Sequence, residues 1–355
     1  MATPHEILEA LKEIKYPGYN RDIVSFGIVR DIEVATAGVT VTLAPGGARP
    51  EAVDEIATAV RAVVTRLTGV ATVDIVLQEP EPARPRTRGG RPEIPGVRHI
   101  VAVASGKGGV GKSTVAVNLA LALHALGHRV GLLDADVYGP SVPLMLGLRE
   151  RPRQTEGKGI IPAEKFGIKV ISLGLFVEEG TPVIWRGPMI NKLLTQFLRD
   201  VEWGELDFLV LDLPPGTGDA QLTIVQQVPL SGGVIVTTPQ DVALLDVQRG
   251  ITMFRQVNAP VLGVIENMSY HLCSGCGERV EIFGHGGGAK MAAQFEIPLL
   301  GEIPLVSAIR EACDAGTPIV VADPDGPQSR VFLDIARRVA AEAEQRAATQ
   351  LPTIH

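Results

Sequence analysis

Residues 105–115 read Ser-Gly-Lys-Gly-Gly-Val-Gly-Lys-Ser-Thr-Val, and no other segment limits the possible folds of this chain so strongly. A short apolar, β-branched run precedes them at residues 99–104, and apolar residues recur at helical spacing over residues 113–126. A strand, a glycine-rich loop and a helix in this order are typical of a phosphate-binding loop, because loop N–H groups and the helix N-terminus both face phosphate oxygens. We therefore expect a nucleotide at the following residues: Gly106, Lys107, Gly108, Gly109, Val110, Gly111, Lys112, Ser113 and Thr114.

Apolar strands alternate with helical segments over most of the chain after residue 98. Such alternation predicts an α/β fold, here a P-loop NTPase with a doubly wound, mostly parallel sheet. The expected strands are residues 99–104, 129–134, 168–173, 208–213, 233–237 and 261–266. A charged, alanine-rich helix is expected at residues 329–349, so we assign residues 98–350 to one nucleotide-binding domain.

The first 78 residues predict a separate small α+β domain in the order α-β-β-α-β. Its expected elements are a helix at 5–15, strands at 23–35 and 39–43, a helix at 50–68 and a strand at 71–77. Residues 79–97 are dense in proline, arginine and glycine, which predicts an extended linker. Its arginines either contact an acidic partner or are solvated.

Carboxylates follow two of the predicted strands. Asp134 and Asp136 come at the end of one, and Asp212 ends another after four apolar residues. Ligands bind doubly wound sheets at the carboxyl ends of the strands, so these side chains are expected near the phosphates. The Asp212 pattern is that of Walker B, whose carboxylate meets Mg²⁺ through its water shell, and Ser113 would serve the same ion. The alternative for Asp134 and Asp136 is a role as turn or helix-cap carboxylates.

Two of the three cysteines, Cys273 and Cys276, lie three positions apart. This spacing allows both thiolates to ligate one metal, but a metal usually takes four ligands, so one chain supplies half of the set. Two copies of the pair on a two-fold axis would provide four thiolates for an iron–sulfur cluster or a zinc ion. The spacing alone leaves iron, zinc, a redox pair and two unrelated thiols open. Cys313 falls on a helical pattern and is expected to be a small packed residue.

Composition and hydropathy exclude several classes of function. The formal charge of -7 and the pI near 5.6 argue against a general nucleic-acid coat. The first residues lack the basic flank and apolar core of a signal peptide, and no charge-free apolar run reaches membrane-spanning length. We therefore expect a cytoplasmic protein with no membrane and no nucleic-acid partner.

The lysine-bearing loop resembles the deviant P-loop of the MinD, ParA and nitrogenase iron-protein group. The resemblance implies an ATPase that works as a face-to-face homodimer, with Lys107 reaching the nucleotide of the partner as an arginine finger does in trans. The alternative for Lys107 is a solvated loop lysine. The resemblance also implies that Asp136 positions the attacking water and that Asn267 and Pro304 belong to the adenine pocket, while Asp134 serves the magnesium shell or local hydrogen bonds.

Four motifs in order make the chain similar to the Mrp/ApbC family. They are the P-loop, Asp-Leu-Pro-Pro-Gly-Thr-Gly-Asp at 212–219, Glu-Asn-Met-Ser at 266–269 and the cysteine pair. The resemblance implies a slow ATPase whose cofactors are ATP, Mg²⁺ and a 4Fe-4S cluster, the cluster being shared by Cys273 and Cys276 of two subunits and passed to apo iron–sulfur proteins. With this family, zinc becomes the less favoured metal.

The N-terminal residues are similar to the MIP18-like domain found in iron–sulfur scaffold ATPases. The similarity rests on Tyr16-Pro-Gly-Tyr and on Asp22-Ile-Val. Members of that domain family commonly carry a cysteine just after the second strand, and residues 42–50 contain none. We therefore expect a docking or regulatory role for this domain.

A different class of function also fits the P-loop resemblance. MinD and ParA relatives are positioning ATPases that act on a membrane or on DNA. A membrane-targeting version should end in a basic amphipathic helix with bulky apolar residues, whereas this chain ends Glu-Gln-Arg-Ala-Ala-Thr-Gln-Leu-Pro-Thr-Ile-His. An electron-transfer ATPase similar to the nitrogenase iron protein is a third possibility, with a different placement of cysteines.

Overall fold

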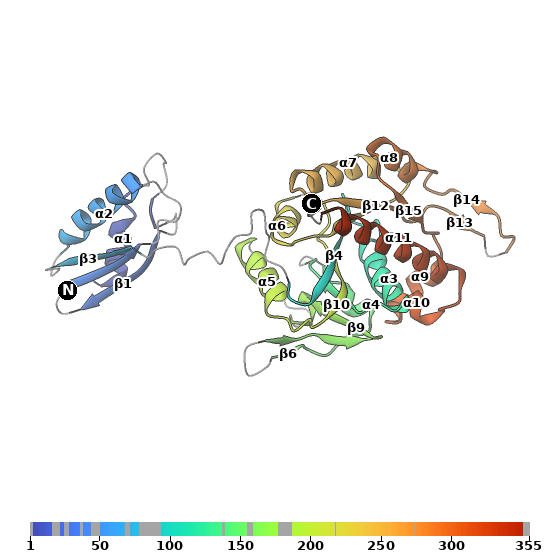
Figure 1. Ribbon diagram of the computed structural model, residues 1–355, viewed down its shortest axis with the longest axis horizontal. Helices are drawn as coiled ribbons and strands as arrows, with labels where there is room; N and C mark the ends of the chain where they lie inside the picture. Colours follow the sequence, from blue (N-terminus) through green and yellow to red (C-terminus); the bar gives the residue numbers. More distant parts are fainter. Residues whose placement is uncertain are drawn as a thin grey trace, which may run out of the picture. The chain divides into compact units, whose positions relative to one another are not determined.

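The computed structural model divides the chain into two compact units, residues 1–89 and residues 90–355 (Figure 1). The structure describes residues 3–15, 22–24, 28–35, 38–43, 50–67, 72–77, 94–136, 139–154, 159–176, 187–216, 218–273 and 275–350. Most of the predicted linker at 79–97 and of the segment at 42–50 therefore lies outside the described residues. Among the described helices, none has the length and apolar run needed to cross a bilayer.

The N-terminal unit has the predicted order of elements. They are α1 (Pro4–Leu11), β1 (Val29–Ala35), β2 (Gly38–Leu43), α2 (Pro50–Thr65) and β3 (Val73–Leu77). β2 pairs antiparallel with β1 and parallel with β3. Thr3 and Glu6 form a capping box that starts α1, because each side chain satisfies a free backbone N–H of the other residue.

The first predicted strand of this unit was placed too early. Ile23 lies in a turn, fully buried, and its N–H donates to Ile14 O at 2.9 Å, while the strand begins only at Val29. The apolar residue that looked like the start of a strand instead fills the core from a turn. Similarly, α1 ends at Leu11, short of the predicted residue 15.

The C-terminal unit is built on an eight-stranded sheet in the order β15-β12-β11-β4-β10-β5-β9-β8. All its neighbours pair in parallel except β8, which is antiparallel to β9 at one edge. The strands are β4 (Val97–Ala104), β5 (Val130–Asp134), β8 (Ala163–Lys165), β9 (Ile168–Ser172), β10 (Leu206–Asp212), β11 (Gly232–Thr237), β12 (Val261–Glu266) and β15 (Leu299–Glu302). The predicted doubly wound P-loop fold is thus confirmed.

Helices cover both faces of this sheet, which explains why its central strands are apolar throughout (Figure 1). The helices are α3 (Lys112–Ala125), α4 (Val142–Met145), α5 (Gly187–Arg199), α6 (Asp219–Gln227), α7 (Asp241–Gln256), α8 (Gly287–Phe295), α9 (Ser307–Asp314), α10 (Ile319–Ala322) and α11 (Pro327–Gln350), with a 3-10 turn at Leu173–Leu175. α3 and α11 pack in one core, and α5 and α7 in the other.

Two short antiparallel hairpins leave the main sheet. One pairs β6 (Arg153–Gln154) with β7 (Ile160–Ile161), and the other pairs β13 (His271–Leu272) with β14 (Arg279–Val280). Figure 1 shows the second hairpin extending away from the body of the unit, beyond β12 and β15. This hairpin carries the cysteine pair at its turn.

Candidate functional site

The phosphate-binding loop connects the end of β4 to the start of α3, in the predicted context. Gly111 has φ +78° as the N-terminal cap of α3, a left-handed conformation that side chains disfavour. Gly106 is needed for a different reason, since a Cβ there would lie 2.1 Å from Asp246 Cβ of α7. The loop is therefore shaped by glycine conformation at one end and by close packing against α7 at the other.

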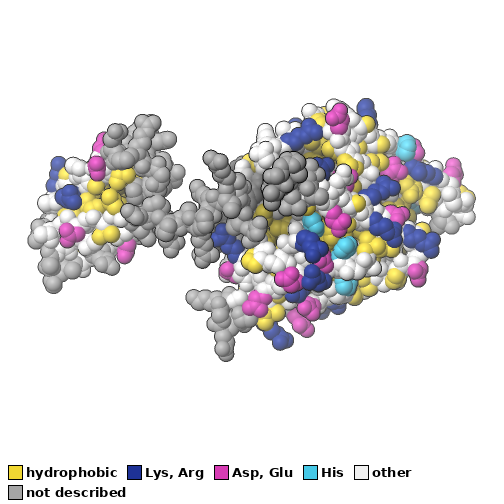
Figure 2. Space-filling model, in the orientation of Figure 1, with side chains coloured by type: hydrophobic (Ala, Val, Ile, Leu, Met, Phe, Trp, Pro, Cys, Tyr) yellow, Lys and Arg dark blue, Asp and Glu magenta, His cyan; other side chains and the backbone are white. Residues whose placement is uncertain are grey.

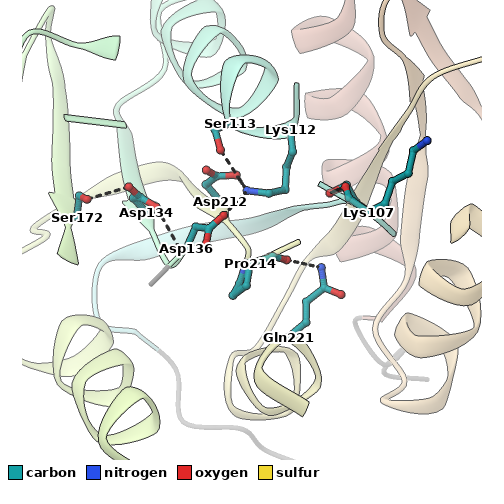
Figure 3. A network of polar contacts seen from close by, with 10 residues as sticks. Lys107, Lys112, Ser113, Asp134, Asp136, Ser172, Asp212, Pro214 and Gln221 are labelled. Carbon is teal, nitrogen blue, oxygen red and sulfur yellow. Dashed lines mark hydrogen bonds and ion pairs between the residues drawn. The ribbon is translucent and has the colours of Figure 1, made fainter. Parts of the chain in front are cut away.

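Lys112 lies at the centre of a buried cluster of charges (Figure 3). Its Nζ is 2.5 Å from Asp212 Oδ1, 3.2 Å from Ser113 Oγ and 3.7 Å from Asp136 Oδ2. The side chain is 6% exposed, so its charge must be balanced by neighbours, and Asp212 and Asp136 do this. The structure thus brings together four predicted site residues, Lys112, Ser113, Asp136 and Asp212, from three segments of the chain.

The two carboxylate oxygens of Asp212 differ in their contacts. Oδ2 is buried and accepts no hydrogen bond from the residues that the structure describes, while Oδ1 contacts Lys112. Burial raises the pKa of Asp212, and Lys112 opposes this shift. A buried oxygen without a donor needs a ligand or a proton, and Mg²⁺ prefers oxygen donors. Asp212, with the Ser113 hydroxyl beside Lys112, fits the magnesium that the fold implies.

Asp134 is engaged in local hydrogen bonds. Its Oδ1 accepts from the Asp136 N–H at 3.1 Å and its Oδ2 accepts from Ser172 Oγ at 2.8 Å. Burial and the neighbouring Asp212 charge raise the pKa of Asp134 to about 7. Both oxygens accept hydrogen bonds within the fold, one of them from the backbone at Asp136, and a role of Asp134 in the magnesium shell stays a prediction.

Lys107 does not join the Lys112 cluster. Figure 3 shows its side chain directed away from Lys112 and Asp212, and Nζ donates to Gln240 Oε1 at 3.4 Å. Its carbonyl oxygen accepts from Ser105 Oγ at 2.9 Å. These contacts hold the loop, and the partly buried Lys107 points away from Lys112 and Asp212 (Figure 3).

Asn267 and Pro304 come from neighbouring strand ends. Ser269 N–H donates to Ile303 O at 2.9 Å, which brings the segments after β12 and β15 together. Asn267 is 7% exposed, and its Nδ2 donates to Val110 O in the P-loop at 2.8 Å. Its amide is thus already committed to the P-loop backbone, and the adenine role stays a prediction.

The cysteine pair occupies the turn of the β13–β14 hairpin. Cys273 is half-buried and Cys276 is exposed. The Cys273 N–H donates to Glu278 O at 2.9 Å, and the Gly277 N–H donates to Cys273 O at 2.8 Å, which closes the turn. Backbone N–H groups of Cys276 and Gly275 lower the pKa of Cys273. In the part of the chain that the structure describes, no three His, Cys, Asp or Glu side chains gather to hold a metal ion.

Exposed apolar side chains lie in the same segment as the two thiols. Leu272 and Val280, in the strands of the hairpin, are each 42% exposed, and Ile282, just after it, is 54% exposed. The hairpin arginine is occupied within the chain, since Arg279 stacks 4.0 Å above the Tyr270 ring and lies 3.9 Å from Glu302. The hairpin therefore presents thiols and apolar surface to solvent.

Several contact residues were not foreseen from the sequence. Ser172 holds Asp134, Gln240 holds Lys107, and Asp246 packs on the P-loop. The signal for Gln240 existed, since it follows the carboxyl end of β11 as Asp134 and Asp212 follow theirs. Cys313 is 4% exposed, as predicted for a packed residue. The side chain of Asp219, the last residue of the motif at 212–219, lies outside the described residues.

Comparison with solved structures supports the fold. A nucleotide-binding protein from Archaeoglobus fulgidus, determined in complex with ADP, has a TM-score of 0.59 and 40% identity, covering 67% of this chain and 92% of that one. The cell division ATPase MinD from Pyrococcus furiosus has a TM-score of 0.52 at 21% identity, covering 68% of this chain and 98% of that one. The second likeness shows the fold alone.

Sequence comparison covers nearly the whole chain. An iron–sulfur cluster carrier protein of Aquifex aeolicus is 44% identical, covering 96% of this chain and 98% of the relative, and one of Escherichia coli is 47% identical, covering 82% and 79%. The model of iron–sulfur cluster assembly proteins matches residues 4–75, and that of the NUBPL iron-transfer P-loop NTPases matches residues 96–340. The chain therefore belongs to the NUBPL iron-transfer P-loop NTPase family.

Proposed function

We propose that this chain is an ATP-dependent carrier that binds an iron–sulfur cluster and passes it to apo iron–sulfur proteins. The observation that carries the proposal is the pair formed by half-buried Cys273 and exposed Cys276, on a hairpin of the same unit as the P-loop. Two accessible thiolates hold iron well, yet they form half of a ligand set, so cargo bound by them stays exchangeable. The carrier names of the full-length relatives agree with this reading.

The charged cluster supports hydrolysis of ATP to ADP and phosphate. Lys112, which contacts Asp212, would move to the phosphates, and Asp136, which lies beside Lys112, would orient the attacking water. Magnesium, held near Ser113 and Asp212, would neutralise developing charge on the phosphoryl oxygens. Asp134 acts indirectly, by fixing the Asp136 backbone. Asn267 and Pro304 would line the base.

We further propose that the carrier is a homodimer. The outward direction of Lys107 leaves its ammonium group available to a second subunit, and the half ligand set at Cys273 requires one. The exposed apolar side chains Leu272 and Val280 would be buried when two hairpins meet. Four thiolates then suit a 4Fe-4S cluster, with zinc as the less favoured occupant. Because these thiols must stay reduced, we place the protein in the cytoplasm.

The domain assignment is part of the proposal. Residues 1–78 would form the MIP18-like domain, residues 79–97 the linker and residues 98–350 the ATPase domain. The N-terminal domain lacks the cysteine common in its relatives, so we assign it a role in docking apoproteins rather than in binding metal.

Anaerobic reconstitution tests the cargo. Wild type and a Cys273→Ala, Cys276→Ala variant are incubated with iron, sulfide and zinc, and bound metal and sulfide are counted per dimer. Wild type should hold about four irons and four sulfides per dimer, and the double variant should hold none. Replacement of Cys313, which is buried beside Asn118, is the matched control and should leave loading unchanged. Zinc alone in wild type, or iron retained by the double variant, would overturn the carrier proposal.

A positioning ATPase is the second candidate, and the fold likeness to MinD is what favours it. On the face drawn in Figure 2, however, basic and acidic side chains are interspersed over the C-terminal unit, without a single-sign patch. ATP-dependent pelleting with liposomes or DNA would support this candidate instead of the carrier.

A further inference from the structure

The segment that carries the cysteine pair leaves and re-enters the core beside one residue, Glu266. The chain departs from the end of β12, forms the β13–β14 hairpin and returns at the start of α8. We call this segment between β12 and α8 the excursion; Ser269 lies near its start and Gly288 at its end. Both contact the carboxylate of Glu266, so the base of the excursion is closed by a single side chain.

The Glu266 contacts are short and buried. Oε1 accepts from Ser269 Oγ at 2.6 Å, and Oε2 accepts from the Gly288 N–H at 2.5 Å. Glu266 and Ser269 are both 0% exposed, so water does not compete for these hydrogen bonds. Gly288 packs closely against this side chain, because a Cβ there would lie 3.0 Å from Glu266 Cβ.

The next residue along the chain touches the nucleotide loop. Asn267 Nδ2 donates to Val110 O at 2.8 Å, and a Cβ at Gly111 would lie 2.3 Å from the same nitrogen. Of these two adjacent residues, Asn267 therefore contacts the P-loop and Glu266 contacts both ends of the cysteine excursion. Any movement of the P-loop that displaces Asn267 must be taken up at Glu266.

We propose that Glu266 is a positioning residue that transmits the nucleotide state of the P-loop to the cysteine hairpin. This inference rests on the proposed function and deepens it, since it names the route by which ATP would alter the hold on the cluster. When Glu266 keeps its hydrogen bonds to Ser269 and Gly288, the two ends of the excursion are fixed. When movement of the P-loop breaks these hydrogen bonds, the hairpin and its thiols change position.

Thiol reactivity in the apo protein tests this route without any cluster. The alkylation rates of Cys273 and Cys276 in the full chain are followed by mass spectrometry, without nucleotide and with Mg-ADP or a non-hydrolysable Mg-ATP analogue. In wild type the analogue should change the rates by about fivefold or more, the lower end of ordinary coupling between sites. In Glu266→Ala the ratio should fall to about one, while nucleotide affinity, measured by calorimetry, stays within about threefold of wild type.

Two further variants separate a positioning role of Glu266 from a general loss of stability in the fold. Glu266→Gln keeps an oxygen for Gly288 and an amide for Ser269, so it should restore the nucleotide response. Ser329→Ala removes another fully buried hydroxyl, which donates to Ile319 O at 2.9 Å and to Asp323 O at 2.6 Å, and should keep the response. If Glu266→Ala does not fold, Ser269→Ala replaces it and should reduce the response in the same direction.

Three outcomes would overturn the proposal. They are a wild type whose thiols ignore nucleotide, a Glu266→Ala protein with the wild-type ratio, and a Ser329→Ala protein that loses the response as fully as Glu266→Ala. Protection caused only by burial between two subunits would persist in Glu266→Ala and would therefore count against the route. Iron loading plays no part in the measurement, so failure of the carrier function would be seen separately, in the reconstitution experiment.

Discussion

Replacing Gly106 by alanine should damage the C-terminal unit through one steric contact. Gly106 does not adopt the left-handed conformation that would exclude alanine on backbone grounds. A Cβ would, however, lie 2.1 Å from Asp246 Cβ and 2.6 Å from Asp246 O, both on α7. Backbone atoms of a packed helix cannot rotate away, so the loop or the helix must move.

The size of this effect follows from the distances. Ordinary contact begins at 3.4 Å, so α7 and the loop must separate by about 1.3 Å. Overpacking of this kind costs about 1–3 kcal/mol, and the rigid neighbour places Gly106→Ala near 3 kcal/mol. For a unit of this size that corresponds to a decrease in Tm of roughly 6–12 °C. The shift also displaces Gln240, the contact of Lys107, at the start of the same helix.

Thermal unfolding of ligand-free protein, followed by circular dichroism, measures the change. Gly108→Ala is the matched control, because nothing lies within 4 Å of a Cβ at Gly108 and its φ is not in the left-handed region. Its Tm should stay within about 2 °C of wild type. Equal Tm values for Gly106→Ala and Gly108→Ala would refute the reasoning, since they would mean that α7 does not constrain the loop.

Three other changes test the site. Asp212→Asn removes the charge that balances buried Lys112, so magnesium-dependent phosphate release should fall by about tenfold or more, and a wild-type rate would contradict the assignment. Lys107→Ala should abolish ATP-induced dimers in sedimentation but leave ADP affinity within about threefold, since Nζ points away from Lys112 and Asp212 of its own chain; weakened ADP binding would argue against action in trans. Burial lowers the pKa of His99 below 6.5, so the unfolded chain gains a proton that the native state does not, and Tm should decrease as pH falls from about 7 to 5. His99→Gln should flatten this decrease, whereas exposed His285→Gln should not.

The fold was largely predictable because its central strands are continuous apolar runs. Six strands of the C-terminal unit begin and end within two residues of the predicted positions. The two edge strands were missed, since Leu299–Glu302 is four residues long and contains glycine, and Ala163–Lys165 is three residues long and polar. An edge strand buries little apolar surface, so its sequence carries little signal.

The site was predictable only where residues follow a strand end. Asp134, Asp136 and Asp212 share that position, and the structure places them together as expected. Gln240 also follows a strand end but was missed because it is uncharged and belongs to no motif, and Asp246 was missed because it lies within a helix and belongs to no motif. Contacts of this kind depend on how helices pack over the sheet, which periodicity does not specify.

Lys112 and Asp212 balance each other's charge in the buried site. Lys112 has to leave Asp212 before its ammonium can face a phosphate, and departure would strand a fully buried carboxylate whose second oxygen already lacks a partner. An unpaired buried charge is costly, so Asp212 must gain a proton or a cation at the moment it loses Lys112. Nucleotide and magnesium are therefore expected to enter together. The same exchange moves the side chain of Lys112, which lies at the start of α3 next to Gly111. Asn267 packs against the loop at Gly111, and Glu266 is the residue before Asn267 in the chain.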